Sequence, residues 1–337
     1  MDDSIKTYKC PNCGAALTFD SKTQKLHCSH CDTSIDVEAM KALSDTPSGT
    51  DQDNARWNTS DAGSNWSSGE QQGMRSYHCP TCGAELVTDE TTAASTCAYC
   101  GSPVVLSDHL SGAKRPNYVI PFKVDKKTAK ETLKNFYKGK IFLPRAFSAE
   151  NHLEEISGIY VPFWLYSCES KGSFSFDATR THHYTDGDYD VTETEHYLVL
   201  RDGEARFNNI PVDGSSKMDD AYMDAIEPFD YSAITDFHTD YLPGYAAQTY
   251  DEDATACAPR ATARVKNTTI AAIRRTCDYT TLTPRTSKIS TTQNSVDYAL
   301  LPVWMLTTNW HGKSYHFAIN GQTGKLIGDL PIDKGRL

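Results

Sequence analysis

The chain contains 337 residues, a length that indicates about two domains. Its 33 Lys and Arg residues against 44 Asp and Glu leave a net charge of −11, which argues against a broadly basic nucleic-acid-binding protein. Hydrophobic residues make up 39%, enough for a core, but no stretch approaches the ~18–20 apolar residues that span a bilayer. The N-terminus has no basic-then-apolar signal sequence, so we expect the chain to begin in the cytoplasm.

Eight of the eleven cysteines form two identical frames, each C-x2-C-x14-C-x2-C, with the second frame 69 residues after the first. They are Cys10, Cys13, Cys28 and Cys31, followed by Cys79, Cys82, Cys97 and Cys100. The neighbouring sequence also repeats, because CPNCGAALTFD returns as CPTCGAELVTD. This pattern indicates a duplicated ribbon module.

Two C-x2-C pairs supply four thiolates in the tetrahedral arrangement that Zn²⁺ prefers. Iron is the second choice, since all-sulfur tetrahedra suit it too. Glycine follows Cys13, Cys82 and Cys100, where it lets the backbone turn so that amides face the sulfurs. Four protein ligands leave no position for substrate. The sequence therefore predicts two structural zinc ions per chain, without which modules of about 30 residues would not fold.

Composition divides the chain into four parts: zinc ribbon 1 at 1–43, a flexible linker at 44–75, zinc ribbon 2 at 76–112 and an α+β domain at 113–337. The linker is rich in Ser, Gly, Asp, Asn and Thr and has almost no aliphatic residues, so it cannot offset its ordering entropy. Its Trp57 and Trp66 are expected to be scattered surface aromatics, with partner contacts as the alternative.

The α+β domain is predicted to mix several strands with a few helices. In chain order we expect a helix over 126–138 capped by Asp125, a short helix from Ser148 to Gly158, strands over 159–207, a helix opening at Ser215 or Ser216, a helical run over 251–276 interrupted near Pro259, and strands over 296–327.

A second internal similarity lies in this domain. The segment YVPFWL at 160–165 is similar to LLPVWM at 300–305, which lies 140 residues later. A proline in such a strand suits an entry or edge position. We expect an internal pseudo-repeat, with Trp164 and Trp304 packed in the core.

The segment 181–196 gathers His182, His183 and His196 with five carboxylates. Its single glycine does not fit the frame of an EF-hand loop, so we predict a solvated hairpin. An enzyme using this hairpin would require a third metal or a cleft beside His182 and His196.

The remaining cysteines, Cys168, Cys257 and Cys277, are predicted to be buried structural thiols. The chain has no phosphate-binding loop and no motif of a common hydrolase. We therefore predict no catalytic residue and no further cofactor.

Ribbons bind nucleic acid or protein, and charge favours protein here. Residues 1–112 contain 7 Lys and Arg against 15 Asp and Glu, and each zinc–tetrathiolate centre adds about −2. Such a module would repel phosphate backbones. The expectation is a non-enzymatic interaction or scaffold protein, with a nucleic-acid-binding accessory in replication or transcription as the alternative.

The motifs YKCPNCGAALTFD, GIYVPFWLY, ALLPVWML and NGQTGKLIGDLP together resemble a bacterial family with two transcription-factor-IIB-type zinc ribbons. Its members are often labelled primosomal-helicase-like or phage-replication proteins. Some are linked to band-7/flotillin-type and phage-shock membrane-stress proteins. The resemblance implies a scaffold that recruits such partners at the cytoplasmic face of the bacterial membrane.

Members of that family often continue into hydrophobic membrane segments. Lys334 and Arg336 would suit the cytoplasmic flank of such a segment. The resemblance therefore implies membrane association through a C-terminal anchor beyond residue 337, or else a naturally short relative.

Overall fold

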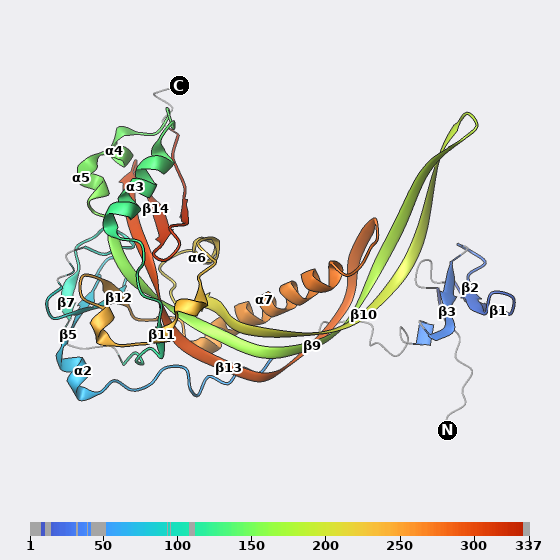
Figure 1. The fold of residues 1–337 in the computed structure, drawn as a ribbon, viewed down its shortest axis with the longest axis horizontal. Coiled ribbons are helices and arrows are strands. Elements are labelled where there is room, and N and C mark those ends of the chain that lie inside the picture. The colour runs from blue at the N-terminus through green and yellow to red at the C-terminus, as the bar shows by residue number, and fades with distance from the viewer. Residues whose placement is uncertain are drawn as a thin grey trace. The chain divides into compact units, whose positions relative to one another are not determined.

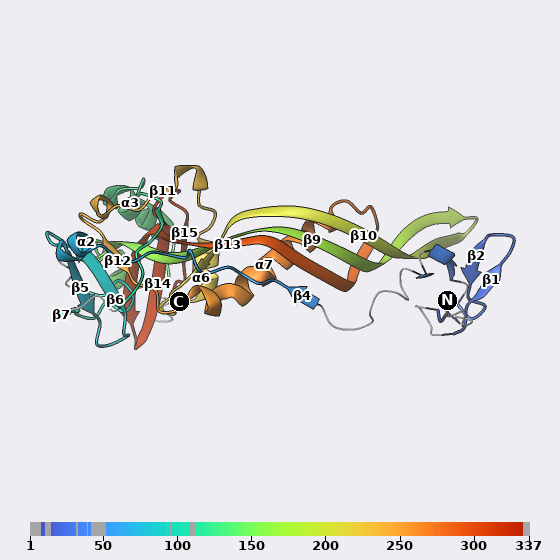
Figure 2. The same cartoon turned by 90° about the horizontal axis from the view of Figure 1, so that it is seen from below.

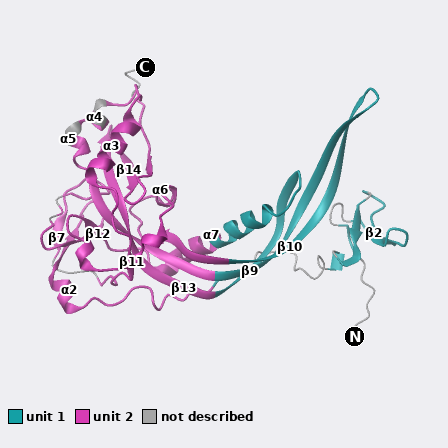
Figure 3. Ribbon diagram, in the orientation of Figure 1, with its two compact units in different colours: residues 1–55, 169–205, 265–292 teal, residues 56–168, 206–264, 293–337 magenta. Residues whose placement is uncertain are grey.

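The structure is a computed structural model that describes residues 8–10, 15–31, 33–38, 40–41, 52–92, 94, 96–107 and 112–332. The chain divides into two compact units (Figure 3). Unit 1 comprises residues 1–55, 169–205 and 265–292, and unit 2 comprises residues 56–168, 206–264 and 293–337.

The first part of unit 1 is a three-stranded antiparallel sheet in the order β1-β2-β3. Its strands are β1 (Thr18–Asp20), β2 (Lys25–His27) and β3 (Ser34–Asp36). The buried side chains of this module form their own small core, which consists of Cys10, Leu17, Leu26, Cys28, Ile35 and Met40.

Three long strands pass through both units: β9 (Ser157–Asp186), β10 (Tyr189–Asp213) and β13 (Thr281–Trp310). They lie side by side, with β9 between the other two (Figures 1 and 2). In unit 1, β4 (Gln52–Asn54) adds to β13 in parallel. The helix α7 (Ala254–Arg274) supplies Ile273 to the core of this part, where it packs with Phe174 and Val199 of the sheet.

The sheet has twelve strands, whose main path runs β11-β8-β13-β9-β12-β6-β5-β7. Its shorter members are β5 (Met74–His78), β6 (Glu85–Asp89), β7 (Val105–Ser107), β8 (Tyr118–Val119), β11 (Thr235–Asp236) and β12 (Ala246–Gln248). The strands β14 (Lys313–Asn320) and β15 (Leu326–Gly328) extend it from β13 through antiparallel pairs.

Short helices cover parts of unit 2. They are α2 (Ser68–Gln72), α3 (Lys126–Tyr137), α4 (Arg145–Ser148), α5 (Glu150–Leu153) and α6 (Asp220–Ala225), with 3-10 turns at Tyr231–Ala233 and Thr239–Tyr241. Leu133 of α3 and Leu153 of α5 are buried in one cluster with Trp304 and Phe317. This packing places α3 to α5 against β13 and β14. No helix within the described ranges has the length and apolar character needed to cross a membrane.

The predicted mixed α+β architecture is confirmed, and the helix over 126–138 is found as α3. Asp125 caps it by accepting a hydrogen bond of 2.7 Å from the amide of Thr128. The other predicted helix limits were less accurate. The helix expected from Ser148 to Gly158 is only α5, because β9 already begins at Ser157.

Two further helix predictions require correction. The helix expected to open at Ser215 or Ser216 begins at Asp220, because Asp219 supplies the cap by accepting from the amide of Ala221. The helix α7 continues through Pro259 without interruption.

The segment predicted as a flexible linker, 44–75, is ordered over its described part. The indole Nε1 of Trp57 donates to Thr262 Oγ1 at 3.1 Å, and that of Trp66 donates to the carbonyl of Ala113 at 2.9 Å. Residues 42–51 lie outside the described residues. From residue 52 on, two tryptophans bind distant parts of the chain, which composition does not reveal.

The predicted internal similarity has a structural counterpart in unit 2. Ile159 of β9 pairs in parallel with Ala246, and Ala299 of β13, 140 positions later, pairs in parallel with Tyr118. Each strand therefore enters the sheet beside a short parallel neighbour.

The prolines and tryptophans of these segments repeat the correspondence. The carbonyl of Pro162 accepts from the amide of Gly214 at 2.8 Å, and that of Pro302 accepts from Gly321 at 2.8 Å. Trp164 and Trp304 are 2% and 4% exposed, which confirms that they pack in the core.

Candidate metal centres

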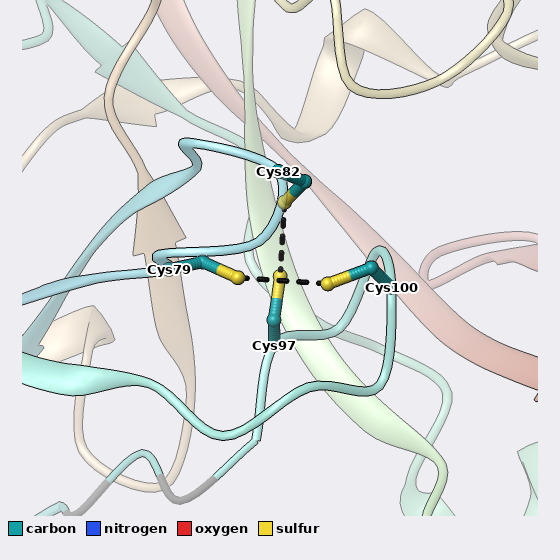
Figure 4. A group of neighbouring side chains, drawn as sticks. All are labelled: Cys79, Cys82, Cys97 and Cys100. Carbon is teal, nitrogen blue, oxygen red and sulfur yellow. Dashed lines mark hydrogen bonds between the residues drawn. The ribbon is translucent and has the colours of Figure 1, made fainter.

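The second cysteine frame forms a compact cluster of four sulfurs (Figure 4). The Sγ atoms of Cys79 and Cys100 lie 3.5 Å apart, and those of Cys82 and Cys97 lie 3.6 Å apart. A tetrahedral ion with metal–sulfur bonds of about 2.3 Å would separate its sulfurs by about 3.8 Å. The four thiols thus have the spacing needed to hold a metal ion.

The sequence folds into this cluster because each C-x2-C-G segment makes the same turn. The amide of Gly83 donates to the carbonyl of Cys79 at 2.8 Å, and the amide of Gly101 donates to that of Cys97 at 2.8 Å. Both glycines have φ of +72°, a conformation in which any side chain would be strained. Two matching turns therefore present their sulfurs to one point.

The backbone and a nearby cation favour thiolates in this cluster. Although burial raises the pKa of the Cys79 thiol, hydrogen bonds from the amides of Cys82 and Thr81 lower that pKa to about 7. The ammonium of Lys217 lies beside the turn, since a Cβ placed on Gly83 would be 3.9 Å from its Nζ. Its positive charge offsets part of the negative charge that thiolates would bring.

Desolvation is the larger effect at Cys82 and Cys97. Burial raises the pKa values of Cys82 and Cys97. A metal ion would overcome this cost because it binds the thiolate form.

Hydrogen bonds fix the second turn of the cluster to the large sheet. The hydroxyl of Thr307 on β13 donates to the carbonyls of Ala98 and Tyr99, at 3.2 and 2.8 Å. The buried hydroxyl of Tyr99 donates to Gln248 Oε1 of β12, and Gln248 Nε2 donates to Ser215 Oγ at 2.7 Å. Sequence reasoning missed Lys217, Tyr99, Gln248 and Thr307, because none of them belongs to a repeated motif.

The segment predicted as a separate ribbon, 76–112, is part of the large sheet. Leu86 and Val87 of β6 pair with Gln248 and Ala247 of β12. The cysteines Cys79 and Cys97 also belong to the same buried cluster as residues of β9 and β13. The sheet therefore continues across the predicted boundary near residue 112, because β12, far along the chain, supplies a neighbouring strand to β6.

The first cysteine frame brings Cys10, Cys28 and Cys31 together, with Sγ atoms of Cys10 and Cys31 at 3.6 Å. Cys13, the predicted fourth ligand, lies outside the described residues. Cys31 is exposed, and its Sγ lies 3.0 Å from Thr33 Oγ1. This cluster is also suited to hold a metal ion, at the surface of a small module.

Other candidates from the sequence lie outside these clusters. Cys168 and Cys257 are buried as predicted, and burial raises their pKa values to about 11 and about 12. Cys277 is half-buried. His182 and His196 lie on exposed strands of the β9–β10 hairpin and are not part of a ligand group among the described residues.

The fold and site define an α+β protein with a large sheet, few helices and two cysteine clusters suited to metal ions. The chain is 36% identical over 334 residues to the uncharacterized protein YdjG of Bacillus subtilis strain 168, and the match covers 99% of this chain and 92% of that protein. The chain belongs to the same family as YdjG. No family model and no solved structure matches it.

Proposed function

We propose that this chain is a non-enzymatic zinc-binding interaction protein with two structural zinc ions. The convergence of four thiols at the second cluster carries the proposal. Four sulfurs complete a tetrahedral shell, so a zinc ion bound there has no open position for water or substrate. The residues that would hold zinc are the eight cysteines of the two frames.

In this proposal the first module docks partner proteins. Its Phe19 on β1 is 54% exposed, whereas Leu17 and Leu26 of the same module are buried in its core. Exposed aromatic side chains are enriched at protein interfaces. The net negative charge of residues 1–112 supports a protein partner over a phosphate backbone.

The family resemblance found in the sequence supports a scaffold at the cytoplasmic face of a bacterial membrane. Proteins of the band-7/flotillin type or the phage-shock type are then the expected partners. This part of the proposal rests on the resemblance alone and is tested by the identity of the captured proteins.

The first test is metal analysis of the purified full chain. We expect two zinc ions per chain, and one after Cys28→Ser. Two irons per chain would overturn the choice of zinc. The variant that combines Cys28→Ser with Cys97→Ser should bind no metal. Metal retained by this variant would indicate another site and would overturn the non-enzymatic proposal.

The second test is a crosslinked pull-down of the full chain, read by mass spectrometry, with Phe19→Ser and Cys277→Ser as matched variants. The serine at position 19 removes the exposed ring, whereas position 277 is outside both clusters. We expect Phe19→Ser to lose the main partners at unchanged zinc content and Cys277→Ser to keep them. Partners that disappear on nuclease treatment would instead indicate nucleic-acid binding.

A further inference from the structure

The end of the β9–β10 hairpin is only two strands wide. β13 begins at Thr281, whose Oγ1 lies 2.6 Å from Thr179 Oγ1 of β9. β9 continues beyond that point to Asp186, and β10 returns from Tyr189. We call residues 182–196 the hairpin tip. A two-stranded ribbon of this kind has marginal stability by itself.

Cross-strand contacts fix the register of the hairpin tip. Thr185 Oγ1 lies 3.3 Å from Asp190 Oδ1, and His183 Nδ1 lies 2.9 Å from Thr192 Oγ1. The strands are joined by a two-residue loop whose first residue, Gly187, has φ of +60°. In such a hairpin the two residues that flank the loop form a hydrogen-bonded pair. Along the strands, hydrogen-bonded pairs then alternate with pairs that make no backbone hydrogen bond to each other.

This alternation leaves a free row of backbone groups on the outer edge of β10. Asp190, Thr192 and Thr194 belong to the pairs that do not bond across the hairpin, so their N–H and C=O groups point away from β9. β10 pairs only with β9 in the part of the chain that the structure describes. An open strand edge is a template for another strand.

One face of the hairpin tip exposes aromatic side chains. Tyr184 is 50% exposed and Tyr189 is 77% exposed. The register places Tyr184 opposite Val191, on the same face as Tyr189. An incoming strand would lie beside this apolar group.

The charge of the hairpin tip indicates which kind of strand would bind at this edge. Residues 182–196 contain five carboxylates and no Lys or Arg; the carboxylates are Asp186, Asp188, Asp190, Glu193 and Glu195. A second copy of the chain docked edge to edge would bring like charges together, which is destabilising. A segment with Lys or Arg would instead pair with the carboxylates and place its cations near the tyrosine rings.

We propose that the outer edge of β10 in the hairpin tip binds an extended, Lys- or Arg-bearing segment of a partner protein as an added strand. The proposal deepens the proposed interaction function, on which it rests, by naming a second surface separate from the cysteine clusters. The backbone edge supplies binding, and the carboxylates with Tyr184 and Tyr189 supply selectivity.

The test uses the full chain and a capped ten-residue peptide that alternates Lys with Thr or Val. The matched peptide has Glu at each Lys. We expect the Lys peptide to slow hydrogen exchange at residues 189–196 and the Glu peptide to bind at least about tenfold more weakly. Raising the salt concentration should weaken binding of the Lys peptide, because salt screens exposed charges.

The decisive variants are Thr194→Pro and Thr194→Ala. Proline removes an N–H that points outward and leaves the β9–β10 pairs intact, and edge strands tolerate it there. We expect Thr194→Pro to weaken peptide binding about tenfold or more and Thr194→Ala to change it less than about twofold. Circular dichroism and the melting temperature verify that both variants fold. Tyr184→Ser combined with Tyr189→Ser provides a side-chain variant that keeps the backbone edge.

Equal binding of the Lys peptide to Thr194→Pro and to the unmodified chain would overturn the proposal, as would exchange protection outside the hairpin tip. Concentration-dependent dimers that protect residues 189–196 without peptide would identify a second copy as the occupant and also overturn it. Because Phe19→Ser and Cys28→Ser leave the hairpin tip unchanged, they should still bind the peptide. Loss of partner capture in those variants alone therefore concerns only the first module.

Discussion

The two cysteine modules have the same cysteine spacing but different structural surroundings. In the first module β1 pairs with the module's own β2, through Thr18 with His27. In the second, the equivalent strand β6 pairs with β12, through Val87 with Ala247. A strand from far along the chain takes the place of a local one. Identical local chemistry can thus produce a module with its own core or a part of a larger sheet.

The difference is clearest at one repeated position. Phe19 and Thr88 occupy the same place in CPNCGAALTFD and CPTCGAELVTD. Phe19 is 54% exposed, whereas Thr88 is fully buried and donates to the carbonyl of Thr92 at 2.7 Å. The second module therefore depends on its neighbours. Three predictions test that dependence, and a fourth tests a buried charge in the same unit.

The largest effect is expected from Cys97→Ser. Cys97 belongs to the main buried cluster, so loss of the thiol that would hold the proposed metal should lower the melting temperature by about 10 °C or more. The matched Cys28→Ser should shift the main transition by less than about 2 °C, because its core is a separate cluster. Calorimetry with metal analysis measures both. Equal shifts would show that the two modules depend on the rest of the chain to the same degree.

Exchanging the residues at the repeated position should have a smaller effect on stability, and only in the second module. Thr88→Phe removes the hydrogen bond to the carbonyl of Thr92 and places a larger side chain at a buried position, so it should cost about 1–3 kcal/mol of unfolding free energy. Phe19→Thr changes an exposed side chain and should stay within about 0.5 kcal/mol. Denaturant unfolding gives both values. An unchanged unfolding free energy in Thr88→Phe would contradict the dependence of β6 on the buried hydroxyl of Thr88.

Lys217→Met should weaken the second metal centre. Lys217 Nζ is 2.8 Å from Asp251 Oδ2 and lies beside the turn of Cys82, where its charge favours thiolates. We expect about tenfold lower metal affinity, in competition with a chelating dye. Lys25→Met, in an exposed pair of the first module, is the control and should leave the second centre unchanged. Unchanged metal affinity in Lys217→Met would contradict an electrostatic role for Lys217.

The smallest effect concerns pH and a buried carboxyl group in unit 2. Burial raises the pKa of Asp213 to about 6, although Arg260 at 2.9 Å opposes the shift. Because the folded pKa lies above the unfolded value, the contribution of this group is full at low pH and is lost as pH rises toward 6. The unfolding free energy of the unmodified chain should therefore fall relative to Asp213→Asn between about pH 4 and pH 6. Parallel stability curves would contradict the raised pKa.

Much of the site could be predicted from the sequence, because a cysteine cluster depends on short-range chemistry. The spacing of Cys79, Cys82, Cys97 and Cys100 and the glycines after Cys82 and Cys100 already require two matching turns. Asp125 likewise predicted the start of α3, because a capping side chain accepts a hydrogen bond from an amide only three residues away.

The sequence by itself determined the two cysteine frames, their turns and the repeated Pro-x-Trp strands, since each depends on residues close together in the chain. Only the tertiary structure decided that β12 would join β6, that Trp57 and Trp66 would anchor part of a polar segment, and that Lys217 would lie beside the second cluster. These features depend on contacts between residues far apart in the chain. Such contacts are selected by the packing of the whole sheet, which no local pattern encodes.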